Sequence, residues 1–406
     1  MGKEAIFEGL KVLDVASYIA APAAATMLSD FGAEVIKIEP LEGDPYRTMS
    51  SLPGMPVSGH NYCWSLTSRN KRGVALNLKQ PEGQAVLRRL IARADVFITN
   101  FPLNVRERLG LAYRQVAPLN ERLIYASLTG YGELGPEANR PGYDINAWWA
   151  RSGLMDLSRS EAGSLPVRSL PGMGDHPTAA ALYGAIVTAL YRRERTGRGA
   201  HVSTSLLANG AWANGVMIQA KLSGAKIVER RPRHAPLNAL SNLYLCRDGR
   251  WLILSLLHEE KLWPEFIARI GHPDLGTDER FSSLKARRSH APELTAELDR
   301  IFAGRDSTDW QAVFESAELP LGVVQRLGDV PADRQMRLND VLVGESGGDA
   351  DALTVNSPIW IAGAAKVLPR PAPALGEDTI AVLRDLGFAP EEIETLQRAG
   401  AIGTAP

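Results

Sequence analysis

The alternation of short apolar runs with helical stretches over the first 130 residues constrains the fold more than any other feature of this sequence. Residues 10–15, 34–38, 95–99 and 123–127 are rich in Val, Ile and Leu and have the length of buried strands. Helical patterns separate them, such as residues 81–93, whose apolar positions fall on one face. Strands that alternate with helices build βαβ units. We therefore predict an α/β fold with a Rossmann-like, mostly parallel sheet.

The rest of the chain predicts a second, smaller domain. A chain of 406 residues is too long for one simple core. An Arg- and Pro-rich stretch at 230–236 is typical of a linker, and residues 243–246 and 251–255 beyond it are typical of a hairpin. We predict three parts: a large domain over residues 1–224, a small α+β domain with long linkers over 225–330, and a C-terminal segment over 331–406 that returns to the large domain.

The charge balance excludes several classes of function. The 45 basic and 46 acidic residues leave a net charge of −1, which removes the non-specific electrostatic drive for binding nucleic acid or an anionic membrane and leaves only a local basic patch as a route to such binding. No run approaches the roughly 18 apolar residues of a membrane span, and the N-terminus lacks the apolar core of a signal peptide. Cys63 and Cys246 lack metal-ligand or disulfide spacing. We expect a cytoplasmic protein without a bound metal or a permanently bound cofactor.

A candidate nucleophile lies in the segment Gly172-Met-Gly-Asp-His-Pro-Thr178, just before a long predicted helix. We place Asp175 as the N-cap of that helix. One interpretation is that Asp175 only caps the helix. The other is that free N–H groups and the helix dipole keep the carboxylate ionised so that it attacks an acyl group, with the N–H groups of residues 172–174 as oxyanion donors. The spacing alone does not decide between them.

A resemblance that runs nearly from end to end does decide. Gly9-Leu-Lys-Val-Leu-Asp14 opens a series of motifs that closely resembles class III CoA-transferases and occurs in the same order. This superfamily includes formyl-CoA transferase, carnitine CoA-transferase and α-methylacyl-CoA racemase. The other motifs that carry the resemblance lie at residues 20–22, 32–39, 70–72, 76–79, 81–83, 100–101, 130–132, 142–146, 174–175, 195–199, 374–379 and 386–387.

The resemblance implies that Asp175 is the catalytic aspartate and that the large domain binds CoA. Asp175 then moves CoA from an acyl-CoA donor to a carboxylic acid through an aspartyl anhydride and an aspartyl-CoA thioester. Lys79 and Arg108 have the charge that the CoA phosphates need. Pro40 replaces an arginine of the family, so Arg72 or Lys71 is expected to replace its charge. The positions that match CoA contacts of the family are Tyr18, Ile19, Ala20, Arg72, Leu76, Asn77, Lys79, Asn100, Phe101, Arg108, Arg140 and Tyr143.

The resemblance also implies an interlocked, ring-like dimer. The linkers near residues 206–235 and 325–345 would thread around the partner subunit, which is either a second copy or a related chain. The family's oligoglycine loop, a flexible lid in some members, is missing from the second domain, so another loop would have to close the site.

Three other functions compete with the transferase. The racemase branch has a histidine where this chain has Tyr143, and a tyrosine is a poor base at neutral pH. His176 is the alternative base, although a histidine in a first helical turn is more often a bystander. A non-catalytic CoA-binding subunit is disfavoured because Asp175 and its glycines are retained. A nicotinamide-dependent oxidoreductase is excluded because the first strand–helix turn, residues 16–22, lacks a glycine fingerprint.

The acyl group is not determined by the sequence. Trp148 and Trp149 are expected to face different directions and to pack in the interior, unless one of them lines a pocket for a bulky acid. Arg151, Arg168 and the run at 230–233 would suit a second carboxylate, as in succinyl-CoA.

Overall fold

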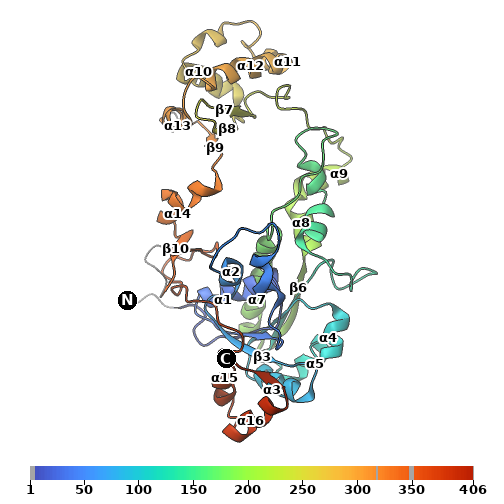
Figure 1. Cartoon of the computed structure of the whole chain (residues 1–406). Coiled ribbons are helices and arrows are strands. Elements are labelled where there is room, and N and C mark those ends of the chain that lie inside the picture. The colour runs from blue at the N-terminus through green and yellow to red at the C-terminus, as the bar shows by residue number, and fades with distance from the viewer. Residues whose placement is uncertain (1–4, 317–318, 347–351, 406) are drawn as a thin grey trace. The chain divides into compact units, whose positions relative to one another are not determined.

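The computed structural model describes residues 5–316, 319–346 and 352–405 (Figure 1). Internal contacts divide the chain into two compact units. Unit 1 comprises Met1–Met155, Arg168–Gln219 and Arg334–Pro406, and unit 2 comprises Asp156–Val167 and Ala220–Asp333. The boundaries predicted at residues 224 and 330 for independently folding domains stay predictions.

A seven-stranded sheet organises unit 1, in the order β12-β3-β2-β1-β4-β5-β6. The strands from β1 to β6 are parallel to their neighbours, and only the short β12 runs antiparallel, beside β3. This confirms the predicted mostly parallel sheet. The strands are β1 (Lys11–Asp14), β2 (Glu34–Glu39), β3 (Lys71–Leu76), β4 (Val96–Thr99), β5 (Ile124–Thr129), β6 (Ala200–Ser205) and β12 (Ile402–Gly403).

Side chains that alternate along the strands create two apolar layers. Val12 pairs in register with Val35 and Val96, and all three lie in the core on one face of the sheet. Their successors, including Leu13, lie in the core on the other face. Because both faces of a parallel sheet are covered, every residue of β4 and β5 is buried.

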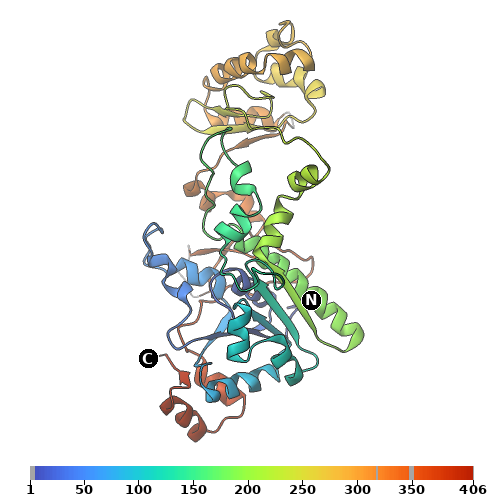
Figure 2. The ribbon, with the colours of Figure 1, turned by 90° about the vertical axis from the view of Figure 1, so that its right-hand side faces the viewer.

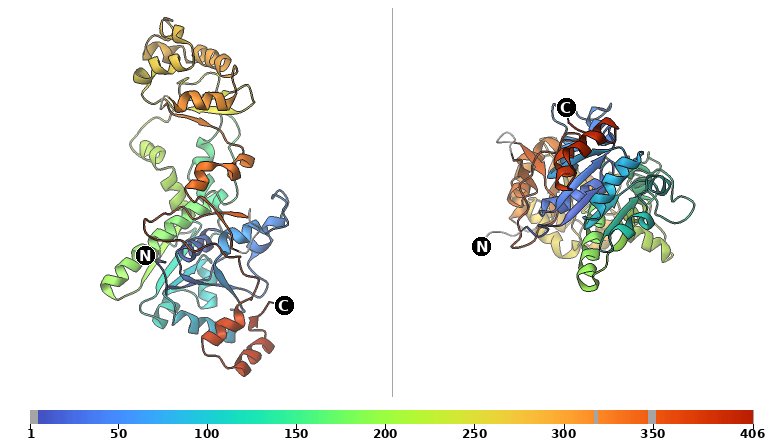
Figure 3. Two further views of the ribbon diagram at one scale, coloured as in Figure 1. Left: turned by 90° about the vertical axis from the view of Figure 1, so that its left-hand side faces the viewer. Right: turned by 90° about the horizontal axis from the view of Figure 1, so that it is seen from below.

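Helices cover both faces. On the first face lie α1 (Ala20–Asp30), which is buried along its whole length, and α7 (Asp175–Thr196), which runs beside β6 (Figure 2). On the second face lie α3 (Pro81–Ile91), α15 (Thr379–Asp385) and α16 (Pro390–Arg398). Figure 3 shows how the C-terminal helices lie against the strands of the first half of the chain. Residues more than 300 positions apart in sequence thus share one core: Asp378 accepts a hydrogen bond from the Gly73 N–H at 2.8 Å.

Shorter elements complete unit 1. They are η1 (Pro45–Ser51), α2 (Tyr62–Ser68), α4 (Leu103–Leu109), α5 (Tyr113–Val116), η2 (Ala117–Leu119), the π-helical η3 (Asp144–Ala150), α6 (Leu154–Leu157), α8 (Leu206–Ala213), α9 (Gly215–Leu222), α14 (Arg334–Leu338), β10 (Leu342–Gly344) and β11 (Leu353–Val355). Helices α6 and α9 lie where the chain passes between the two units.

Unit 2 is an α+β unit with its own core. The predicted hairpin is confirmed, since β7 and β8 pair antiparallel, and β9 adds a third strand. Aromatic side chains, among them Tyr244, Phe266, Phe302 and Trp310, fill the space between this sheet and the helices. The elements are β7 (Leu243–Leu245), β8 (Trp251–Leu254), α10 (Glu259–Arg269), η4 (Pro273–Gly276), α11 (Leu284–Ser289), α12 (Ala291–Phe302), α13 (Ser307–Glu315), β9 (Leu321–Val323) and η5 (Leu327–Ala332).

The described part of the chain has neither a membrane-spanning helix nor a cluster of metal-ligating side chains. No helix there has the length and apolar character needed to cross a membrane. No group of three or more His, Cys, Asp or Glu side chains in the same residues is arranged to hold a metal ion.

Candidate active site

The strand order defines where a ligand can enter. The chain runs outward from β1 through β2 to β3 on one side and through β4 to β6 on the other. In open parallel sheets, ligands bind beyond the carboxyl edge at such a point, where the loops that follow the two central strands, here β1 and β4, diverge. The two loops are tied together by reciprocal hydrogen bonds: Ser17 N–H donates to Asn100 Oδ1 at 2.9 Å, and Asn100 Nδ2 donates to Ser17 O at 2.7 Å.

Helix α7 places Asp175 at this edge. Because β6 is parallel to β5, the chain must return from the carboxyl edge to the amino edge before β6 begins, and α7 makes this return. In the last turn of α7, Arg193 Nη1 bonds to Oδ1 of Asp95, the residue before β4, at 2.9 Å. The first residue of α7 therefore lies at the opposite, carboxyl edge.

The predicted capping role of Asp175 is wrong. The N-cap of α7 is Gly174, Asp175 is the first helical residue, and no side chain makes the cap hydrogen bond. Asp175 is partly exposed. Its pKa is shifted by burial and by a neighbouring charge.

Asp144 holds the turn before α7. Its buried carboxylate accepts the Gly174 N–H at 3.2 Å. Gly174 must be a glycine, since a Cβ there would lie 2.6 Å from Cγ of Trp148. The Met173 N–H donates to Leu170 O at 3.2 Å. The N–H groups of Met173 and Gly174 therefore already have acceptors in this structure, and the oxyanion role predicted for residues 172–174 stays a prediction.

The electrostatic environment of Asp175 also differs from the sequence-based expectation. Burial, and then the negative charge of Asp144, raise the pKa of Asp175 to about 7. The helix dipole, worth about 0.3–1 kcal/mol at a surface site, is outweighed here. Desolvation lowers the pKa of His176, which favours a neutral imidazole at pH 7. A carboxylate with a perturbed pKa at a topological switch point is a candidate for chemistry.

Two tyrosines border the Asp175 turn. The Tyr18 ring meets the Tyr143 ring edge-on at 5.8 Å, and burial, followed by a hydrogen bond that the Tyr18 hydroxyl donates to Tyr143, raises the Tyr18 pKa. Tyr46 is buried beside Ile19 in a small apolar cluster. Burial, then its contact with Cys63 and then the charge of Asp175, raise the pKa of Tyr46.

Tyr46 and its neighbour Asp44 were missed by the sequence analysis. Asp44 is the N-cap of η1 and accepts the Tyr46 N–H, with Pro45 in the first turn. An Asp followed by Pro is a readable helix-start pattern, and it could have identified the turn.

Most of the predicted CoA contacts lie on loops or helices that follow carboxyl ends of strands. Lys79 follows β3, and its N–H donates to Asn77 Oδ1 at 3.2 Å. Asn100 and Phe101 follow β4, and the exposed Arg108 lies on α4, the next helix. Ile19 and Ala20 open α1. Arg140 and Tyr143 lie between β5 and η3 and are exposed, whereas the side chain of Leu76 is fully buried and cannot reach a ligand.

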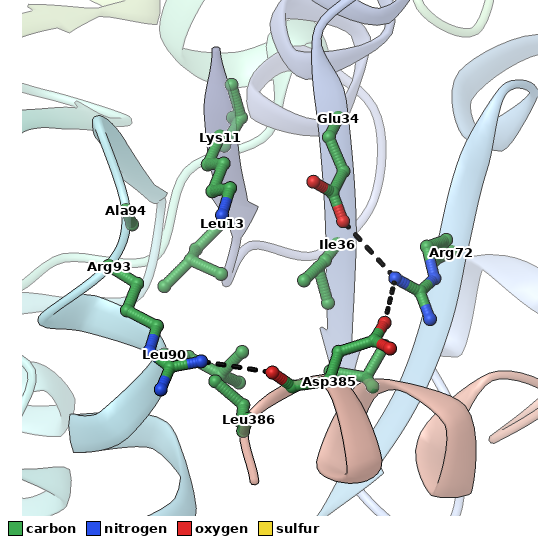
Figure 4. Close-up of a pocket in the computed structure, with 12 residues that line it drawn as sticks. Lys11, Leu13, Glu34, Ile36, Arg72, Leu90, Arg93, Ala94, Asp385 and Leu386 are labelled. Carbon is green, nitrogen blue, oxygen red and sulfur yellow. Dashed lines mark hydrogen bonds and ion pairs between the residues drawn. The ribbon is translucent and has the colours of Figure 1, made fainter. Parts of the chain in front are cut away.

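Arg72 is not brought to this edge. It is the second residue of β3, so it lies roughly 13 Å from the carboxyl end at Leu76. Its guanidinium bonds to Asp385 at 2.9 Å and to Glu34 at 3.2 Å, beside a pocket at the amino edge of the sheet (Figure 4). Lys71 is buried against Asp14 at 2.8 Å. Neither cation replaces the arginine of the family at position 40.

Trp148 and Trp149 stack on each other, with ring centroids 5.8 Å apart and planes 7° apart. The expectation that they face different directions is wrong. Both lie in the core on the α7 side of the sheet, within the π-helical turn that also carries Asp144. Turns of π-helix occur frequently at functional sites.

Comparisons with known proteins agree along almost the whole chain. A family profile described as CoA-transferase family III matches residues 7–379. The chain is 34% identical over 395 residues to (R)-2-hydroxy-4-methylpentanoate CoA-transferase of Clostridioides difficile, covering 97% of this chain and 98% of that protein. It is 31% identical over 398 residues to cinnamoyl-CoA:phenyllactate CoA-transferase of Clostridium sporogenes, covering 97% and 96%.

A solved structure agrees as well. The crystal structure of a CAIB/BAIF family protein from Brucella suis matches with a TM-score of 0.83 and 30% identity, over 95% of this chain and 100% of that one. Family profile, relatives and fold thus lead to one conclusion: this chain is an enzyme that belongs to CoA-transferase family III.

Proposed function

We propose that this enzyme transfers CoA from an acyl-CoA thioester to a carboxylic acid, with Asp175 as the nucleophile. The observation that supports this most is the Asp175 carboxylate itself. It starts a helix at the carboxyl edge of the sheet, it is partly exposed, and no hydrogen bond contributes to its pKa shift. CoA would lie along the loops after β1, β3 and β4, with Lys79 and Arg108 near its phosphates.

The reaction needs no metal and no net proton transfer. An Asp175 oxygen attacks the thioester carbonyl, the C–S bond breaks, and CoA leaves as a thiolate from a mixed anhydride. The thiolate attacks the aspartyl carbonyl, which releases the donor acid and leaves an aspartyl-CoA thioester. The acceptor carboxylate then attacks the aspartyl-CoA thioester, which expels CoA thiolate and forms a second mixed anhydride. The thiolate attacks the acceptor carbonyl of this anhydride, which gives the acceptor's CoA thioester and releases the Asp175 carboxylate. Covalent storage on Asp175 conserves the free energy of the thioester.

We propose 2-hydroxy acids with a bulky apolar side chain as substrates. The names of two relatives specify acids of this kind. A small buried apolar cluster, formed by Ile19, Tyr46, Cys63 and Trp64, lies beside the Asp175 turn through Ile19. A dicarboxylate such as succinate is the second candidate. It is less favoured because Arg151 is paired with Glu137 at 2.9 Å and Arg233 with Asp299 at 2.8 Å.

We also propose an interlocked homodimer in the cytoplasm. Helices α8 and α9 expose Trp212 at 85% and Val216 at 83% of their full surface, which is unusual for large apolar side chains.

The proposed cytoplasmic location is supported by the two cysteines. Both are free and buried, as expected in a reducing compartment.

Replacing Asp175 with Ala should lower kcat/KM by at least about a thousandfold, because the covalent path needs the carboxylate. Incubation of the native enzyme with an acyl-CoA, followed by borohydride or hydroxylamine, should modify Asp175, as detected by peptide mass spectrometry. Asp309→Ala is the matched control, since Asp309 lies in the first turn of α13 in the other unit. An active enzyme whose Asp175 stays unmodified would falsify the covalent path.

The kcat/KM for the donor should rise with pH through about 7, as Asp175 loses its proton and becomes a nucleophile. Asp144→Asn removes the charge that helps to raise this pKa, so it should move the midpoint to lower pH, whereas Asp309→Asn should not. The pH dependence that Asp175 gives to the free energy of unfolding has the opposite sign to that of an ion-paired carboxylate. Because the folded-state pKa exceeds the usual 3.8, the stabilisation by protonated Asp175 is lost as the pH rises from about 4 to about 7. If the midpoint of the kcat/KM pH profile is unchanged in Asp144→Asn, the assignment of this titration to Asp175 is contradicted.

A donor and acceptor screen should favour 2-hydroxy-4-methylpentanoate and phenyllactate over succinate and malate by about tenfold or more in kcat/KM. Burial of an apolar side chain is worth about 1.5–3 kcal/mol, which corresponds to such a ratio. A preference for dicarboxylates would support the second candidate instead. Deuterium uptake from D₂O at the α-carbon of a 2-methylacyl-CoA, without acceptor acid, would support racemase chemistry.

Light scattering of the purified chain should give about twice its 44.0 kDa, because the exposed faces of α8 and α9 need a partner. Trp212→Glu should shift the mass toward the monomer, whereas Trp360→Glu, also at a strongly exposed tryptophan, serves as the control. Activity of the chain expressed alone supports a homodimer. Activity that appears only with a second, related chain would make this one a subunit of a heteromer.

A further inference from the structure

Asp44 joins the two tyrosines beside the candidate nucleophile. Its Oδ1 accepts the Tyr18 N–H at 3.2 Å and the Tyr46 N–H at 2.9 Å. Tyr18 follows β1 and Tyr46 lies in η1, so one carboxylate oxygen fixes the backbone of two separate loops. Asp44 is only 3% exposed, and neither water nor substrate can readily reach it.

A buried charge network fixes Asp44 in turn. Lys37, fully buried on β2, donates to Asp44 Oδ2 at 2.9 Å and also to Ala16 O. On its other side Lys37 lies 3.8 Å from Asp14, which pairs with Lys71 at 2.8 Å. The two carboxylates and two ammonium groups balance to zero charge. Removing one member would leave an uncompensated buried charge.

The backbone of Tyr18 needs this support. Its φ is +63°, a left-handed conformation that is strained for a residue other than glycine. Strain of this kind persists only where the surroundings over-determine it, and it is common at ligand sites. The surroundings here are the Asp44 bond to Tyr18 and the two bonds between its neighbour Ser17 and Asn100.

Both loops contact the Asp175 turn. Ile19 packs with Tyr46, and its Cδ1 lies 3.5 Å from the position that a Cβ on Gly172 would take. The Tyr18 ring meets Tyr143, whose neighbour Asp144 holds the N–H of Gly174. Both loops that carry the phenols therefore border the turn of the nucleophile.

We propose that Asp44 is a positioning residue of the transferase: by bridging the backbones of Tyr18 and Tyr46, it sets both phenols around the thioester that Asp175 attacks. This inference rests on the proposed function. It predicts that Asp44→Asn lowers kcat/KM for the acyl-CoA donor by about ten- to a hundredfold, the cost of a displacement of about 1 Å. In the Tyr18→Phe/Tyr46→Phe background, where the hydroxyls are already absent, Asp44→Asn should cost less than about threefold.

Asp248→Asn is the matched control. Asp248 likewise accepts backbone N–H groups of two segments, Arg250 at 3.2 Å and Ser307 at 3.0 Å, but in unit 2. It should leave kcat/KM within about twofold. Thermal melting of every variant verifies folding. If Asp44→Asn does not fold, Lys37→Met/Asp44→Asn removes both charges of the pair and replaces it. The comparison with the Tyr18→Phe/Tyr46→Phe background, which forms a double-mutant cycle, is then made with this variant.

This double-mutant cycle separates a positioning role of Asp44 from a purely structural one. Equal losses in the wild-type and the double-phenylalanine backgrounds would overturn the inference, and so would a folded Asp44 variant that keeps kcat/KM within threefold. Asp175→Ala, assayed in parallel, tests the proposed function on its own. If Asp175→Ala keeps its activity, the nucleophile assignment fails. If it is inactive and the cycle shows no coupling, only the role of Asp44 fails.

Discussion

The parallel pairing of β1 with both β2 and β4 is the constraint on which the rest of unit 1 depends. At this point the strand order reverses, so the loops that follow β1 and β4 separate at the carboxyl edge. The bonds between Ser17 and Asn100 hold the base of this opening. The same parallel topology forces α7 to begin at that edge. The reversal of strand order and the Asp175 carboxylate therefore meet at the same edge because the strands are parallel.

Two kinds of buried charge lie near this edge, and they behave differently. The group formed by Asp14, Lys37, Asp44 and Lys71 is neutral as a whole, and its members are held by short bonds. It gives the loop after β1 a rigid base. The pKa of Asp175 is instead raised, first by burial and then by the charge of another carboxylate, Asp144. The first arrangement favours stability, whereas the second keeps a carboxylate free for chemistry.

Sequence-based prediction succeeded where local pattern decides. The strand at 34–38 and the start of the long helix near residue 176 were predicted to within a residue, because apolar runs and Gly-Asp-X-Pro act locally. Sequence-based prediction failed where a property depends on residues that are far apart in the sequence. Nothing near Asp175 in the sequence indicates that Asp144, 31 positions earlier, raises its pKa. Arg72 was assigned to CoA by its place in a motif, but the direction of β3 places it at the other edge, against Asp385.

The sequence by itself determined the parallel α/β class, the order of the motifs and the family, since these follow from apolar periodicity and from residue identity. The tertiary structure alone decided that Asp175 starts α7 without capping it, that Trp148 and Trp149 stack, and that Asp44 joins the loops of Tyr18 and Tyr46. The physical reason is that burial, charge and register depend on neighbours in space. Those neighbours are set only when the strands pair and α7 crosses the sheet.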